Sequence, residues 1–425
     1  MGFTDTSPDR SAVVEQHVEN LESPNPRMRS QAVEDLGKLA AHEAVPALIE
    51  RLQEDVNTYV RSASAEALGR IGDVRGIFPL MDALRDSCSF VRRAAAIALG
   101  QMQAKEAQGA LLRALEDPNF YVRRAAINAV GKLGVADHAA MLLPSLDTPD
   151  PRIRRTAIIA LRRLESHDGI PRMVEILESY LLNPNQRDLP VVKTLVVTLG
   201  ELRAGEAVPT LVRVMRGYVG VRSLAAKSLG RIGDAQAAGA LMEALKDDKS
   251  KSLQLSALKS LGQLRYHKAV PAIRPFLDAP DPRMRRTAAM TLGNLRDRDS
   301  VARLLRMARD DDSPLVRPAA VEALGLIGDR RTIEKLLPFV DDSNAYLRAA
   351  LAHALSTLDG QTPAVIDALR RLQDDKVRHV AIAAERALAN CQPLMGEQDV
   401  AQEPDQCPAP ERQHVSWLRR FLGRN

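Results

Sequence analysis

One pattern, seen most fully in residues 117–134, recurs along nearly the whole chain and constrains its fold more than any other feature. An arginine, or a residue that replaces it, marks the same place in twelve copies that are mostly 30 to 33 residues apart. These anchor residues are Arg29, Arg61, Arg92, Arg123, Arg154, Val192, Arg222, Gln254, Arg285, Arg317, Arg348 and Ala381. A fixed period of this length is typical of a solenoid, in which each structural unit contacts only its neighbours.

Each copy predicts one amphipathic helix. The residues one before and three, seven and ten after the anchor are mostly apolar, and this spacing places them on one helical face. Four residues before the anchor most copies have Asn, Asp or Ser, which cap helix starts, and Pro26, Pro151 and Pro282 follow directly. A second apolar segment after each copy, such as residues 44–52, predicts a second helix. Each unit is therefore expected to be a pair of helices.

Glycine recurs eight residues after the anchor in nine copies. Inside a helix it costs about 1 kcal/mol relative to alanine, so its recurrence indicates close backbone approach between neighbouring helices. Gly72, Gly134, Gly233 and Gly328 stand three residues later, where a left-handed residue commonly ends a helix.

The pattern predicts an all-α solenoid of about twelve two-helix repeats. A composition with 45% hydrophobic but only 3% aromatic residues suits a core of Ala, Leu and Val between closely packed helices. We expect residues 1–391 to form the solenoid and residues 392–410 to be a disordered linker rich in proline and acidic side chains. Residues 411–425 form a short basic amphipathic segment.

Composition favours a cytoplasmic protein. The first residues are polar, and no apolar run reaches the roughly 18 residues that a membrane span needs. Cys88, Cys391 and Cys407 are scattered, which argues for a reducing compartment and against a disulfide framework or a zinc site. The net charge of +5 is too small to identify a partner by itself.

The copies resemble HEAT repeats. Several have an Asp six residues before the anchor, as Asp55 stands before Arg61 and Asp117 before Arg123. The motif Ala-Leu-Gly-x-Ile-Gly-Asp in residues 67–73 is similar to that of the phycobilin-lyase-like subclass, the PBS lyase HEAT-like repeats. The resemblance implies a right-handed α-solenoid in which Asp and Arg form a ladder between adjacent units. It also implies that the residues one, five and nine after the anchor line an inner concave surface.

Enzymes of this subclass give an alternative function. Deoxyhypusine hydroxylase binds two iron ions through several His-Glu pairs, whereas this sequence offers only His42-Glu43. Bilin lyase subunits attach tetrapyrroles, and only the motif of the repeats supports that activity here. The eight histidines lie at unrelated offsets, and the sequence has no phosphate-binding loop or nucleophile elbow. We therefore predict no catalytic residue, metal or cofactor, with the hydroxylase-like oxidoreductase and the lyase subunit as alternatives.

The column expected on the concave surface is basic in units three to nine. Apolar side chains stand among its charges on a face that should be exposed to solvent, and this mixture is typical of a binding surface. The alternative is a basic face that is only solvated and binds no partner. The predicted groove residues are Arg93, Arg124, Arg155, Ile159, Lys193, Lys227, Arg286 and Met290, with Ile97 and Val197 beside them. We predict that they bind an acidic segment of a protein partner.

Aromatic residues recur near the start of four of the predicted helices. Tyr59, Phe90, Tyr121 and Tyr346 stand two residues before the anchor, and we expect them to pack between adjacent units. The concave column then has no aromatic residue for base stacking, so nucleic acid is not the expected partner.

The C-terminal segment is predicted to dock. Its apolar and aromatic residues suit an anionic membrane surface or a partner groove, or else a contact that covers the last repeat. They are Val415, Trp417, Leu418 and Phe421.

Overall fold

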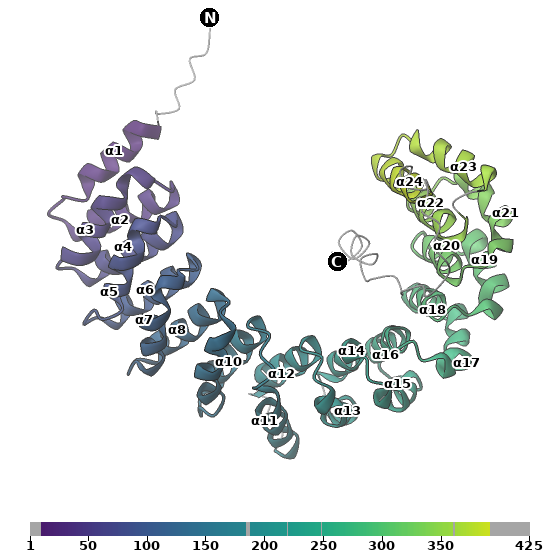
Figure 1. The fold of residues 1–425 in the computed structure, drawn as a ribbon, viewed down its shortest axis with the longest axis horizontal. Coiled ribbons are helices and arrows are strands. Elements are labelled where there is room, and N and C mark those ends of the chain that lie inside the picture. The colour runs from purple at the N-terminus through teal and green to yellow at the C-terminus, as the bar shows by residue number, and fades with distance from the viewer. Residues whose placement is uncertain (1–9, 184–187, 219, 248, 360–361, 392–425) are drawn as a thin grey trace, which may run out of the picture.

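A computed structural model of the chain describes residues 10–183, 188–218, 220–247, 249–359 and 362–391. All regular secondary structure in these ranges is helical, with 24 α-helices joined by turns and short 3₁₀ helices. The helices form an arch in which successive pairs are stacked side by side (Figure 1). The predicted all-α solenoid of two-helix repeats is confirmed.

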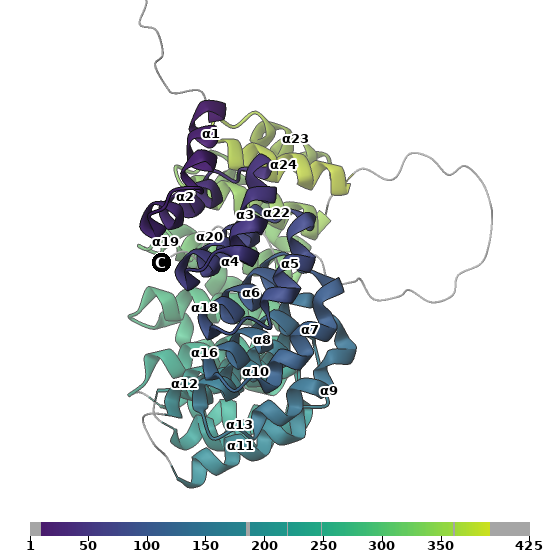
Figure 2. The same cartoon turned by 90° about the vertical axis from the view of Figure 1, so that its left-hand side faces the viewer.

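The even-numbered helices line the inner, concave side of the arch, and the odd-numbered helices form its outer side (Figure 1). The inner helices are α2 (Pro26–Lys38), α4 (Thr58–Ile71), α6 (Ser89–Gln101), α8 (Phe120–Leu133), α10 (Pro151–Arg163), α12 (Leu189–Glu201), α14 (Arg222–Ile232), α16 (Lys251–Gln263), α18 (Pro282–Asn294), α20 (Val316–Ile327), α22 (Ala345–Asp359) and α24 (Arg378–Cys391). Viewed from its left-hand side, the arch presents the N-terminal pairs in front (Figure 2).

The outer helices are shorter, and 3₁₀ turns such as η1 (His42–Ala44) precede many of them. They are α1 (Arg10–Asn20), α3 (Val45–Glu54), α5 (Ile77–Ala83), α7 (Gln108–Arg113), α9 (Ala139–Leu142), α11 (Ile170–Leu182), α13 (Val208–Gly217), α15 (Ala238–Leu245), α17 (Val270–Ile273), α19 (Val301–Asp310), α21 (Ile333–Leu336) and α23 (Pro363–Gln373).

The inner helices start and stop largely where the pattern predicts. The side chains of Asn57 and Asn119 accept hydrogen bonds from the second amides of α4 and α8. Gly72 and Gly134 end these helices with φ angles of 74° and 69°. The same left-handed conformation occurs at six residues that are not glycine, which the sequence did not indicate. They are Ala40, Gln103, Glu165, Arg203, Arg265 and Arg296.

Glycine permits the close stacking of the inner helices. A Cβ atom added to Gly100 would lie 2.7 Å from the Cα of Ala129 in the next inner helix. At Gly131 it would lie 2.7 Å from the Cβ of Ala160. Such short contacts recur because the residue that faces each glycine lies six residues after the next anchor and is Ala, Ser or Thr. The predicted close backbone approach is confirmed.

The apolar stripe fills the space between inner and outer helices. The residues seven after the anchor are fully or almost fully buried in eleven units, including Leu68, Val130 and Leu199. In the last unit Leu388 is only half-buried. The core therefore runs continuously along the described solenoid and thins at α24.

An arginine ladder joins adjacent units. Arg92 donates two hydrogen bonds to the carboxylate of Asp117 in the following unit, at 2.7 and 3.0 Å. Its Nη1 also donates to the carbonyl of Asp86 in its own unit at 2.8 Å. Equivalent pairs join further units, which confirms the ladder. They are Arg29–Asp55, Arg61–Asp86, Arg222–Asp247, Arg285–Asp311, Arg317–Asp342 and Arg348–Asp375.

The ladder is interrupted at mid-array. Arg123 donates to the carbonyls of Asp117 and Pro118, but Thr148 stands where the next unit would supply the aspartate. In the following unit Arg154 donates instead to the hydroxyl of Tyr180 at 2.5 Å. The interruption precedes the long connection between α11 and α12, of which residues 184–187 lie outside the described ranges.

We predict that Gly131→Ala destabilises the solenoid by about 1 to 3 kcal/mol, because the new methyl group forces α8 and α10 apart. The change should lower the urea midpoint although alanine favours helices. Gly239→Ala in α15 is the matched control, since its Cβ would meet no atom within 4 Å. It should be neutral or stabilise by up to about 1 kcal/mol. Equal effects of the two substitutions would contradict the packing role of the inner glycines.

We predict that Thr148→Asp supplies the missing carboxylate to Arg123 and stabilises the protein by about 1 to 2 kcal/mol at pH 7. Proline at the next position is compatible, because Asp117 is also followed by proline. The gain should disappear in an Arg123→Gln background, and Thr148→Asn serves as the neutral control. A gain that persists without Arg123 would contradict the pairing.

The gain should depend on pH. Burial opposes ionisation of Asp117, but hydrogen bonds from Arg92 and the amide of Asn119 outweigh it and keep the pKa below the ordinary value. A carboxyl whose pKa is lowered by folding contributes stability that is present above its unfolded pKa of about 4. The contribution of the carboxylate introduced by Thr148→Asp should therefore be lost as the pH falls below about 4, which urea titrations at several pH values would measure.

Candidate functional site

Four rows of side chains cross the concave face, because residues three or four apart lie on one side of a helix. They lie two residues before the anchor and one, five and nine residues after it. We call the first the aromatic row, defined by Tyr59, Phe90 and Tyr121, and the second the basic row, defined by Arg93, Arg124, Arg155, Lys193 and Arg286. Each row takes one residue from each inner helix.

The structure places every predicted groove residue on an inner helix. The basic row runs from Arg93 on α6 through α8, α10 and α12 to Arg286 on α18, and Lys227 on α14 stands in the row five residues after the anchor. Arg155, Lys193 and Lys227 are exposed, whereas Arg93, Arg124 and Arg286 are half-buried. In the described ranges none of these six cations forms a salt bridge with a carboxylate.

Cations of the outer helices differ in this respect. Arg172 pairs with Asp147 at 2.6 Å, and Arg216 pairs with Glu243 at 2.8 Å. Near the C-terminus Arg371 pairs with Asp341 at 2.7 Å. The six groove cations thus have no salt-bridge partner in the described ranges, whereas these three outer cations are paired. Other concave cations, such as Arg70 and Arg231, are paired with Glu66 and Glu201.

The one acid that the sequence places in this column between units three and nine is itself neutralised. Glu201 accepts hydrogen bonds from Arg162 at 2.9 Å and from Arg231 at 3.2 Å. Its charge is shared between two arginines from adjacent inner helices. The positive character of the middle units therefore persists across α12.

The apolar groove residues are less exposed than we predicted. Ile97, Ile159, Val197 and Met290 lie among the basic residues, but each is half-buried rather than fully wet. Neighbouring inner helices are close enough to cover part of each side chain. These residues therefore add partly exposed apolar surface among the charged side chains.

The aromatic row contradicts the sequence prediction. We expected packing between units, but Tyr59, Phe90 and Tyr121 keep 75%, 58% and 47% of their surface exposed. Tyr346 stacks on His379 of the next unit with 5.2 Å between ring centroids, yet it also remains about half exposed. The helical spacing from the basic row could have indicated this, because residues two before and one after the anchor share a face.

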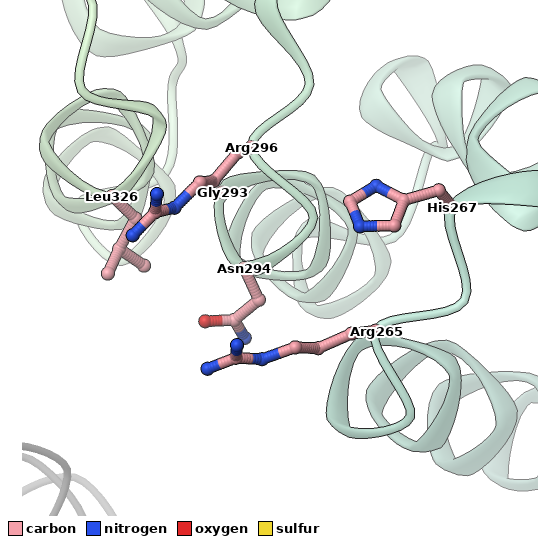
Figure 3. Close-up of a pocket in the computed structure, with 6 residues that line it drawn as sticks. All are labelled: Arg265, His267, Gly293, Asn294, Arg296 and Leu326. Carbon is pink, nitrogen blue, oxygen red and sulfur yellow. The ribbon is translucent and has the colours of Figure 1, made fainter. Parts of the chain in front are cut away.

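A pocket of about 380 Å³ lies at the C-terminal ends of α16, α18 and α20. Figure 3 shows Arg265 and Asn294 with their polar groups side by side, Arg296 next to Leu326, and His267 on the opposite side of the central helix end. Gly293 and Leu326 complete the lining, which contains no carboxylate. Hydrogen-bond donors therefore dominate the pocket, which suits a carboxylate or another anionic group.

Glu322 on α20 stands five residues after the anchor Arg317, on the concave face, and its side chain is half-buried. Burial raises its pKa to about 7, and the nearby positive charge of Arg286 lowers the pKa only in part. The side chain can therefore change its charge near neutral pH, and with it the local potential beside Arg286.

Two enzyme-related expectations can be compared with the structure. His42 of the His42-Glu43 pair contacts Asp73, with 3.3 Å between Nδ1 and the carboxylate. Within the described ranges no three His, Cys, Asp or Glu side chains are grouped closely enough to hold a metal ion. In the same ranges, no helix is both long enough and apolar enough to cross a membrane.

The C-terminal docking prediction cannot be compared in this way. Val415, Trp417, Leu418 and Phe421 lie outside the described residues, as does the predicted linker. Their docking on a membrane, on a partner or on the last repeat stays a prediction.

We predict that Glu322→Gln stabilises the protein by about 1 to 3 kcal/mol at pH 8 and has no effect below about pH 4. The folded pKa lies above the unfolded value, so ionisation costs stability as the pH rises from about 4.5 through 7. Urea midpoints of both proteins across this range would measure the difference. Arg286→Gln in the natural chain should raise the pKa of Glu322 further. A gain that is independent of pH would contradict the raised pKa.

Comparisons with known families agree with the repeat geometry. The family described as HEAT repeats matches residues 14–100, 77–162, 109–189, 239–325 and 308–389. The family described as PBS lyase HEAT-like repeat matches residues 221–247. No curated protein is significantly similar to the chain in sequence.

Solved structures are similar in fold. Importin beta in an ammonium sulfate condition has 13% identity and a TM-score of 0.60, covering 90% of this chain and 62% of its own. Kap95p from a complex with RanGDP has 15% identity and a TM-score of 0.61, covering 90% of this chain and 61% of its own. The chain thus spans less than two thirds of these proteins.

A further similarity concerns a phycocyanin lyase. The complex of CpcE and CpcF from Nostoc sp. PCC7120 has 22% identity, covers 69% of this chain and 98% of its own, and has a TM-score of 0.35, too low to support an argument. The family matches, in contrast, extend over more than half of the sequence and coincide with the stacked helix pairs. The chain belongs to the HEAT-repeat family.

Proposed function

We propose that this protein is a non-catalytic cytoplasmic scaffold or adaptor that binds an acidic segment of a protein partner along its concave face. The observation that carries the proposal is the contrast in charge pairing. Concave cations such as Arg155 and Lys193 have no carboxylate partner in the described ranges, whereas outer cations such as Arg216 are paired. Uncompensated charge on one face attracts a partner of opposite sign.

Charge and apolar contact have different tasks in this proposal. Exposed cations such as Lys227 accelerate association and select acidic partners, because their field extends into solvent. The half-buried Ile159 and Met290 supply affinity when a partner displaces water from them. The donor-lined pocket beside Arg265 and Arg296 extends the same preference for anionic groups towards the C-terminal units.

The structural neighbours support a protein partner in general terms. Kap95p is described in complexes with RanGDP and with Nup1. A solenoid of stacked helix pairs offers a long curved surface that suits such contacts. The acidic nature of the partner rests on the side chains of the present chain alone.

We predict that Arg155→Glu combined with Lys193→Glu weakens binding of a labelled polyglutamate peptide by about tenfold or more, measured by fluorescence anisotropy. The salt dependence of the binding constant should become shallower. Arg113→Glu with Arg306→Glu is the matched control, because both residues are exposed on outer helices. It changes the net charge equally and should leave binding within about twofold.

A second variant separates the apolar contribution. Ile159→Ala with Met290→Ala should mainly increase the dissociation rate of a natural partner, with little change in its association rate.

Equal weakening of polyglutamate binding by the concave and the outer charge reversals would contradict a localised groove. It would mean that polyglutamate responds only to net charge.

A further inference from the structure

The aromatic row is an exposed surface that the acidic-segment proposal does not use. Tyr59, Phe90 and Tyr121 are each the second residue of an inner helix, in α4, α6 and α8. The whole chain has only 14 aromatic residues, so three exposed rings on one face of adjacent units are a concentration of apolar surface. Exposed aromatic groups in such clusters typically anchor partners.

Arginines stand beside these rings. The guanidinium of Arg93 lies 5.8 Å from the ring centroid of Phe90, and that of Arg124 lies 5.7 Å from the centroid of Tyr121. Phe120, packed edge-on against Tyr121, has Arg152 at 4.3 Å from its ring centroid. Arginine and aromatic groups therefore alternate along the start of α6 and α8.

Two hydrogen bonds that this region could form are not made. The Nε atom of Arg93 is buried and has no acceptor in the described structure. At the start of α6, Cys88 occupies the capping position but its side chain accepts no hydrogen bond. In the flanking helices Asn57 and Asn119 do accept that bond. The first turn of α6 therefore lacks the side-chain acceptor that α4 and α8 have, and its amides and the helix dipole favour a carboxylate there.

The spacing of the row specifies the conformation of its ligand. Packed helices are about 8–10 Å apart, so corresponding rings of adjacent units are separated by about that distance. Three residues of polyproline II span about 9 Å, and because this helix has three residues per turn, every third side chain lies on the same side. One side chain in every three of a peptide in this extended conformation can therefore contact one ring in each unit.

We propose that the aromatic row, with Arg93 and Arg124, binds an extended acidic peptide that carries an apolar side chain at every third residue. The apolar side chains lie against Tyr59, Phe90 and Tyr121, and the carboxylates between them accept hydrogen bonds from the arginines and the open amides of α6. This inference rests on the proposed function, because it gives the same class of partner a defined register in units two to four.

Single-stranded nucleic acid fits the row less well. Base stacking needs free ring faces, and Arg93 and Arg124 are already placed over the rings of Phe90 and Tyr121. A peptide side chain can contact the exposed ring edges without displacing these arginines.

The test compares two synthetic peptides on the full-length protein. One repeats the triplet Asp-Pro-Leu, so that leucine recurs at every third residue, and the other has the same composition with its leucines placed side by side. The triplet peptide should bind at least about tenfold more tightly, by fluorescence anisotropy. Phe90→Ala with Tyr121→Ala should remove that preference.

Two controls match the aromatic substitutions. Phe78→Ala removes a ring that is 67% exposed on the outer helix α5. Tyr346→Ala removes a ring at the same repeat offset in α22, where Ala349 replaces the neighbouring arginine. Both should keep the preference for the triplet peptide, and thermal melts should confirm that all variants are folded.

The outcomes separate this inference from the proposed function. If both peptides bind equally, and binding weakens with Arg155→Glu and Lys193→Glu but not with the aromatic substitutions, the register inference is overturned while the acidic groove stands. If neither peptide binds, both are overturned. Displacement of the triplet peptide by oligothymidine through Phe90 and Tyr121 would instead assign the row to nucleic acid.

Discussion

The contact between a helical glycine and the small residue of the next unit governs this structure. At Gly100 and Ala129, as at Gly131 and Ala160, the inner helices approach so closely that a methyl group would meet backbone atoms. The dispersion energy of that contact offsets the poor helix propensity of glycine. The same repeated contact on the inner side favours the curvature of the arch, which is clear in Figure 1. It brings equivalent side chains of successive units into continuous rows.

The arginine ladder adds register to this packing. Each arginine of the seven ladder pairs binds the carboxylate of the next unit and a carbonyl of its own, as Arg92 does with Asp117 and Asp86. A slipped unit would therefore leave charge unpaired in a half-buried site. Where Thr148 replaces the aspartate, this pairing is missing, although Arg163 of α10 still donates a hydrogen bond to Asn128 of α8. The units of Arg123 and Arg154 lack this pairing and lie between two parts of the array in which ladder pairs are present. The long connection after α11 lies close to these units.

Curvature also explains why the concave face has a distinct chemistry. Cations on the outer helices reach acids of adjacent outer helices, and many of them are paired. On the inner side Arg155, Lys193 and Lys227 are exposed and form no salt bridge in the described ranges, and Glu201 is already held between two arginines. Like charges held in a row cost stability, which is typical of surfaces kept for binding rather than for folding. The exposed rings of the aromatic row lie on the same face, so charge and apolar surface are adjacent there.

The amino-acid sequence by itself determined the helix pairs, their caps, the buried stripe and the glycine contacts, because each depends on spacing within one unit. Leu68 and Leu199 could be assigned to the core from the period. The assignment of Arg93 and Lys193 to the concave face also needed the resemblance to HEAT repeats. The helical spacing could also have placed Tyr59, Phe90 and Tyr121 on the same face as the basic row. The extent of their exposure could not be predicted, because it depends on how far the next unit covers the first turn of each helix. The half-burial of Ile159, the raised pKa of Glu322 and the donor-lined pocket beside Arg265 likewise arise between units. Tertiary structure decided these features because they depend on the distance and tilt of neighbouring helices, which no single repeat encodes.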